Sequence, residues 1–149
     1  MNFDKMIEET RSLVRNEKAL NARIISNLKI LYEHHIHLER GFSSFFSFCV
    51  EHLEMCATTA QRRIDAMRLT VQIPDLVDKI GSGQVSLNRI SQVSQFLRQE
   101  KMEAKHELKT EEVRKLLEDV AECKTDFDAK RLLATLSTVE VPKVPDQTK

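Results

Sequence analysis

The side chains best suited to chemistry with a partner are two threonines and three arginines between residues 58 and 68. They are Thr58, Thr59, Arg62, Arg63 and Arg68. On a helix, Thr58, Thr59 and Arg62 share one side, and the other two arginines flank it. Arginine offers a forked set of donors to guanine or to phosphate, and short threonines allow close approach to a DNA backbone. We predict that these five residues bind double-stranded DNA.

The same helix has an apolar side, which predicts how it would pack. This stripe consists of Ala57, Ala60, Ile64 and Met67. The pattern places Asp65 and Ala66 on the opposite, outer side, where the small Ala66 would keep the surface low. A charged outer face is also routine for any solvated helix, so an ordinary surface helix is the alternative interpretation.

Two short helices in this region predict a helix-turn-helix at about 43–70. Four of the seven phenylalanines lie between residues 42 and 48, so the helix from 45 to about 53 should lie in the core. Thr58 or Thr59 would cap the second helix, which runs to about Thr70. Two helices joined by so short a turn are typical of DNA-binding proteins.

A histidine cluster at 34–37 is the one pattern that suggests a metal. His34 and His37 are three residues apart, a usable spacing for two ligands. A third ligand would have to come from elsewhere in the chain, and exposed histidines on a helix surface are the commoner case. We predict no metal site and no cofactor.

No arrangement of residues indicates catalysis. There is no Gly-rich phosphate loop and no serine in a nucleophile turn. Cys49 is interpreted as a core residue and Cys56 as a bystander in a turn, although a helix N-terminus can lower a thiol pKa. We therefore expect no catalytic residues and no enzyme activity.

The composition sets the fold class. The chain has 149 residues, 23 basic and 23 acidic side chains, and only three Gly and three Pro. So few turn formers argue against an all-β fold and predict an all-α protein of one domain. Three cysteines without close pairing argue against a disulfide framework. No apolar run is long enough for a membrane span, so we expect a cytoplasmic protein with no membrane partner.

A long helix should open the chain, over about residues 3–38. Its second half has a regular apolar stripe, whereas Thr10, Glu17 and Asn21 interrupt the stripe that Ile7 and Val14 begin. One continuous helix and a break near Asn16 are both open. Such a narrow stripe can form a coiled-coil seam, and packing within the chain is the commoner explanation.

A bundle of about six short helices should follow, at about 45–53, 58–70, 75–80, 87–99, 111–121 and 126–136. Residues 1–136 would form one helical domain. Residues 137–149, which include Pro142 and Pro145, should form an extended linker or tail.

Three stretches resemble the helical N-terminal domain that precedes the nuclease in many bacterial HNH endonucleases. Residues 41–50 (GFSSFFSFCV) are similar to G-[YF]-x-S-[LF]-x-x-[YF]-C-V, and residues 60–69 (AQRRIDAMRL) to A-x-x-R-I-x-A-A-R-L. Residues 73–87 are similar to x-P-x-[LV]-x-x-x-[IL]-x-x-G-x-[LIV]-S-L. Residues 109–136 are also similar. A weaker likeness, over residues 58–91, is to the helix-turn-helix of ParB-type partition proteins.

The resemblance implies an accessory helical domain that contacts DNA. The nuclease module itself is missing, because no histidine follows His106. We expect a stand-alone relative or a shortened nuclease, without nuclease activity. The alternative is a protein-interaction or dimerisation module that docks through residues 3–38 and binds no nucleic acid.

Overall fold

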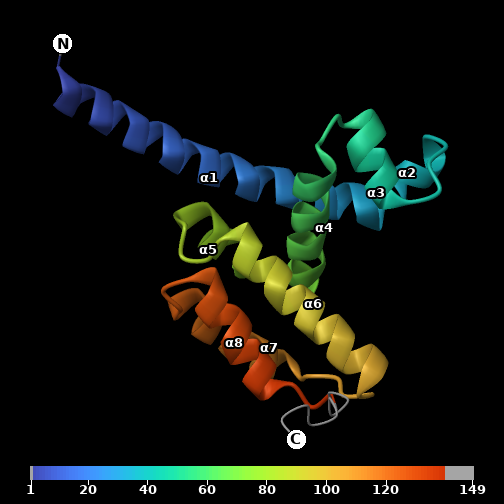
Figure 1. Ribbon diagram of the computed structural model, residues 1–149. Coiled ribbons are helices and arrows are strands. Elements are labelled where there is room, and N and C mark those ends of the chain that lie inside the picture. The colour runs from blue at the N-terminus through green and yellow to red at the C-terminus, as the bar shows by residue number, and fades with distance from the viewer. Residues whose placement is uncertain (1, 140–149) are drawn as a thin grey trace, which may run out of the picture.

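Figure 1 shows the computed structural model, which describes residues 2–139 and contains only helices within that range. This confirms the predicted all-α class with a long first helix. None of the described helices is both long and apolar enough to cross a membrane. The helices are α1 (Phe3–Glu33), α2 (Ile36–Glu39), α3 (Phe45–Ser47), the π-helix η1 (Phe48–His52), α4 (Ala57–Gln72), α5 (Leu76–Ser82), α6 (Leu87–Glu103), α7 (Thr110–Glu122) and α8 (Asp126–Leu136).

Helix α1 runs unbroken through Asn16, so the predicted alternative of a break there is wrong. The helix also ends earlier than residue 38. His35 adopts a left-handed backbone conformation, with φ of 53°, and the chain turns into the single turn of α2. The turn places the His37 and Tyr32 rings against Phe45, with centroid distances of 5.4 and 5.2 Å. Burial of these rings offsets the cost of the left-handed residue.

The predicted helix at 45–53 exists, but it changes type along its length. One α-helical turn, α3, passes into η1, where the N–H of Leu53 donates to the carbonyl of Phe48. The wider π turn is uncommon and places Phe48 and Cys49 in the core. Phe48 then stacks on His52, with ring centroids 5.3 Å apart.

Helix α4 is the centre of the molecule. It crosses between α1 and α6 and packs against both of them (Figure 1). Ala60, Ile64 and Met67 are buried as the apolar stripe predicted, whereas Ala57 is exposed at the first position. The N-cap is Cys56, so the predicted cap at Thr58 or Thr59 is wrong.

Helices α6, α7 and α8 form a second layer, joined by a clamp at Arg89 of α6. Its guanidinium donates to the carbonyls of Val120 and Cys123 at 2.7 and 3.0 Å, at the C-terminal end of α7. It also pairs with Asp126, the first residue of α8, at 2.7 Å. A cation at one helix end and a carboxylate at the next helix start both suit the helix dipoles.

The first residues of the predicted tail are attached to this layer. Ser137 is extended after α8, and both Ser137 and Thr138 bond to Glu100 of α6. Residues 140–149, the rest of the predicted tail, lie outside the described residues.

Candidate functional site

The first part of α1 extends beyond the packed part of the protein, residues 21–139, which we call the body (Figure 1). Every residue from 2 to 20 is exposed, and Figure 1 shows this part of α1 extending away from the other helices. We call residues 2–20 the arm. Packing begins at Asn21 and Ala22 and continues through Leu28, where α1 lies on α4 and α5. At 1.5 Å per residue, the arm is about 27 Å long.

The arm exposes large apolar side chains along one side, and we call this set the arm face. Its members are between 46% and 64% exposed. They are Phe3, Met6, Ile7, Leu13, Val14 and Leu20. A solvated helix normally carries polar residues all round, so six large apolar side chains on one exposed helix make the arm face a candidate interaction surface.

The arm face continues the stripe that packs the rest of α1. Phe3, Ile7, Thr10 and Val14 are spaced by four, three and four residues, and the same spacing leads on to Ile24 and Leu28. In the second half, this stripe lies on the body, where Leu28 is buried. In the arm, the same stripe has no partner within residues 2–139. The apolar stripe of α1 therefore packs against the body in the second half of the helix and is exposed to solvent in the arm.

Charge is balanced along the arm. Between residues 2 and 20 there are four acidic and four basic side chains. Arg11 pairs with Glu8 at 2.7 Å within the helix. Lys18 lies over the C-terminal end of α5, and its ammonium nitrogen is 2.9 Å from where a Cβ on Gly83 would lie. The arm therefore lacks the basic excess that attracts nucleic acid.

The five residues predicted to bind DNA do not form one free surface. Thr58, Arg62 and Arg68 are exposed, whereas Thr59 and Arg63 are half-buried. Arg63 points toward α1 and donates from Nη2 to the side-chain oxygen of Asn21 at 2.9 Å, so it helps to hold α1.

The outer face predicted for α4 is wrong at Asp65 and Ala66, which are buried at 1% and 0% exposure. Helix α6 covers this side, and Arg98 reaches Asp65 at 3.4 Å. Gln61 also donates to Asp65 at 2.9 Å. A helical wheel with one apolar stripe identifies one buried side. Helix α4 is buried on two sides, because both α1 and α6 pack against it.

Three other basic residues, Lys79, Arg89 and Arg98, form ion pairs with acidic residues of the protein itself. Arg89 forms the clamp at α7 and α8, and its side chain is only 12% exposed. Arg98 pairs with Asp65, and Lys79 lies 3.8 Å from the carboxylate of Asp75. Their charges are therefore partly neutralised by local acids.

The histidine cluster is spread by the turn at the end of α1. His34 and His35 are exposed, whereas His37 is 7% exposed and stacks against Tyr32 with centroids 6.0 Å apart. Within residues 2–139, no three His, Cys, Asp or Glu residues lie together as metal ligands would.

The cysteines occupy contrasting environments. Cys56 is exposed, and the hydroxyl of Thr59, 3.5 Å from its sulfur, together with the backbone N–H of Thr59 lowers the pKa of the Cys56 thiol. Cys49 is buried in η1, and burial raises its pKa to about 11. Among the described residues, the side-chain partner of the Cys56 sulfur is the Thr59 hydroxyl, which is not a general base, so the thiol alone does not define a catalytic site.

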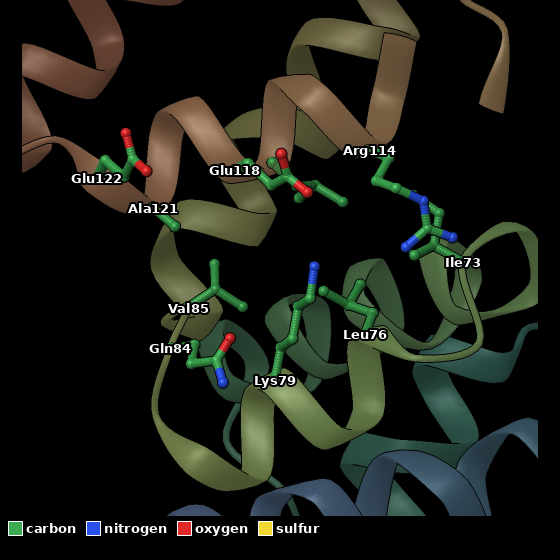
Figure 2. A pocket seen from close by; sticks show the side chains of 10 residues that line it. Ile73, Leu76, Lys79, Gln84, Val85, Arg114, Glu118, Ala121 and Glu122 are labelled. Atoms are coloured by element: carbon green, nitrogen blue, oxygen red, sulfur yellow. The ribbon is translucent and has the colours of Figure 1, made fainter. Parts of the chain in front are cut away.

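A small pocket lies between α5 and α7, with a volume of about 190 Å³ (Figure 2). Leu76 and Val85 form part of its apolar lining, and Lys79 and Arg114 extend along it. Arg114 also binds Asp75 with two contacts of 2.8 and 2.9 Å, which lowers the pKa of that carboxyl. Ligand pockets are usually larger, at about 300–1,000 Å³. The arm face is therefore the stronger candidate site.

Glu100 is a buried carboxylate that sequence reasoning missed. Its oxygens accept bonds from Ser137 Oγ at 2.6 Å and from the Thr138 backbone N–H at 2.9 Å, and the Thr138 hydroxyl also bonds to them. His106 Nδ1 lies 3.2 Å away. Burial alone would raise the pKa of this carboxyl, but the bonds from Ser137, Thr138 and His106 outweigh it and hold the pKa at about 2. A glutamate in a polar helix gives no sequence signal of this role.

Comparison of the chain with protein-family models, with curated proteins and with solved structures found no match. The resemblance to the N-terminal domain of HNH endonucleases therefore stays a prediction from the sequence. The arm face is defined by the structure alone.

Proposed function

We propose that this protein is a helical interaction module that docks onto another protein helix through the arm face. The observation that carries the proposal is the arm itself. Nineteen consecutive residues, 2–20, are exposed on a helix that presents six large apolar side chains on one side. The same stripe packs the body a few residues later, so the arm has the pattern of a packing surface.

The energetics favour association. An isolated helix of this length is marginal in water, because its backbone ordering is not offset by tertiary contacts. Covering each large side chain of the arm face would gain on the order of 1 kcal/mol. Six such gains fall within the range of about 4–15 kcal/mol estimated for bringing two molecules together, and the apolar surface that the partner buries adds to them. A partner therefore stabilises both the complex and the helical state of the arm.

DNA binding through α4 stays a prediction. Its exposed members are Thr58, Arg62 and Arg68, whereas Thr59 is half-buried and Arg63 is bonded to Asn21 of α1. This is a smaller surface than the five residues expected. The arm face therefore supports the interaction function better than α4 supports recognition of DNA.

The proposal is tested by the size of the protein in extracts of the cells that make it. We expect the wild-type chain to sediment in a species larger than its own 17.2 kDa. Val14→Glu places a charge in the arm face and should shift the chain to its monomer size. Ala19→Glu is the matched control, because it adds the same charge to the other side of the arm. A wild-type chain found only as a monomer, or an equal shift in both variants, would overturn the proposal.

A further inference from the structure

We propose that the partner of the arm is the arm of a second copy of this chain, paired antiparallel over residues 3–14. This rests on the proposed function and names its partner. The observations that select a second copy are the spacing of the arm face and the composition of its two flanks. Both the spacing and the flanks of one arm match those of a second arm that runs in the opposite direction.

The line of residues along the middle of the arm, Phe3, Ile7, Thr10 and Val14, forms complete layers when two arms pair antiparallel over residues 3–14. When Phe3 lies across Val14 of the second copy, Ile7 lies across Thr10 of that copy. The twofold axis repeats both layers, which gives four layers with an apolar residue in each. The Thr10 hydroxyl already donates to the Met6 carbonyl at 2.8 Å within its own helix. Thr10 can therefore be covered without losing a hydrogen bond.

The flanks of the arm face decide the orientation. One flank carries Met6 and Leu13, and the other carries Asp4 and Arg11. In an antiparallel pair, like flanks meet, so Met6 lies across Leu13 and Asp4 lies across Arg11. In a parallel pair, opposite flanks meet, and Met6 would face Arg11. Only the antiparallel pair matches apolar with apolar and acid with base.

Polar residues limit the overlap. Sliding the pair by seven residues would set Ile7 against Glu17 and Phe3 against Asn21. The pairing therefore ends at Val14. The body begins to cover α1 at Asn21, seven residues beyond Val14, or about 10 Å along the helix. The two bodies would lie at opposite ends of the paired arms and would not collide.

The test is sedimentation equilibrium of the purified full chain, at about 1–200 µM, a range that covers micromolar dissociation constants. We expect a reversible dimer. Asp4→Lys alone and Arg11→Glu alone each create two like-charged pairs in the dimer, and each should raise the dissociation constant about fivefold or more. The double variant Asp4→Lys/Arg11→Glu should return to within about twofold of the wild type.

The double variant separates pairing between chains from effects within one helix. Arg11→Glu also breaks the pair with Glu8, and Asp4→Lys removes an acid from the first turn. Asp4→Lys also places an ammonium four residues before Glu8, where it can pair within the helix. Circular dichroism of the four proteins is therefore compared as well, and recovered affinity at equal helicity comes from the contact between chains. A double variant no tighter than the singles would overturn the antiparallel pairing.

The outcomes also separate this inference from the proposed function. A purified chain that stays monomeric throughout the concentration range would overturn self-pairing. If the same chain still sediments as a larger, Val14-dependent species in cell extracts, the arm docks on a different protein. In that case the proposed function stands and the second copy is excluded as its partner.

Discussion

At the scale of single residues, the most informative side chain is Glu100, which holds the start of the C-terminal tail. Its carboxylate is fully buried, and Ser137, Thr138 and His106 supply its hydrogen bonds. Removing one partner from such a network leaves buried donors unpaired, and each unpaired donor then costs its full desolvation free energy. Its pKa of about 2 shows that the folded protein favours the ionised form.

We predict that Glu100→Gln lowers the free energy of unfolding at pH 7 by about 1–3 kcal/mol. The folded pKa of Glu100 is about 2, below its ordinary value of 4.5. The stabilisation is therefore complete above pH 4.5 and is lost as the pH falls toward 2. The difference between wild type and variant should shrink over that interval in urea titrations. The exposed Glu103→Gln is the control on the same helix, and a pH-independent difference would contradict the prediction.

Residue types alone predicted the burial of some side chains correctly and of others wrongly. The sequence correctly indicated that Ala60 and Met67 are buried, because apolar residues at helical spacing nearly always face a core. It misplaced Asp65 and Ala66, because an acid and a small residue look like surface positions until a second helix covers them. It also could not show that Arg63 binds Asn21, since 42 residues separate them in the chain.

At the scale of elements, the position of the arm depends on how α1 crosses α5. The helices meet at Ala22 and Gly81, where a Cβ on Gly81 would lie 3.3 Å from the Cβ of Ala22. Gly81 is helical and needs no special backbone conformation, so its value here is its small size. A larger residue would push α1 away from the body.

We predict that Gly81→Val lowers the free energy of unfolding by about 1–3 kcal/mol through overpacking. Adding Ala22→Gly should recover part of the loss, because the two sites touch and their effects are coupled. Thermal and chemical denaturation of the two single variants and the double variant measure the coupling. Ser82→Val adds the same side chain at an exposed neighbouring position and should have a much smaller effect. Strictly additive losses would show that the contact does not limit the crossing.

Helices were easier to predict than their ends. The ranges expected from Gly, Pro and apolar spacing match α5, α7 and α8 to within about two residues. The end of α1 at Glu33 could not be predicted, since it depends on His35 adopting a left-handed backbone and on rings packing against Phe45. The π turn of η1 likewise depends on tertiary packing, for which the local sequence has no marker.

At the scale of the whole molecule, the protein divides into a packed body and an exposed arm on one continuous helix. The sequence predicted the long helix but treated its first half as the weaker part, because Thr10 and Glu17 interrupt the stripe. The repeat of Met6, Leu13 and Leu20 at seven-residue intervals was the signal that could have marked this half as a surface.

This division predicts that the body folds without the arm. Deleting residues 2–16 removes only exposed positions and keeps Lys18 near α5 and Asn21 bonded to Arg63. The free energy of unfolding of the monomer should therefore change by no more than about 0.5 kcal/mol. Any concentration-dependent part of the stability should disappear, because a partner that binds the folded arm stabilises it by mass action. Urea titrations at low and high protein concentration measure both effects. A large loss at low concentration would mean that the arm packs on its own body, and the face it presents in the structure would then not be free for a partner.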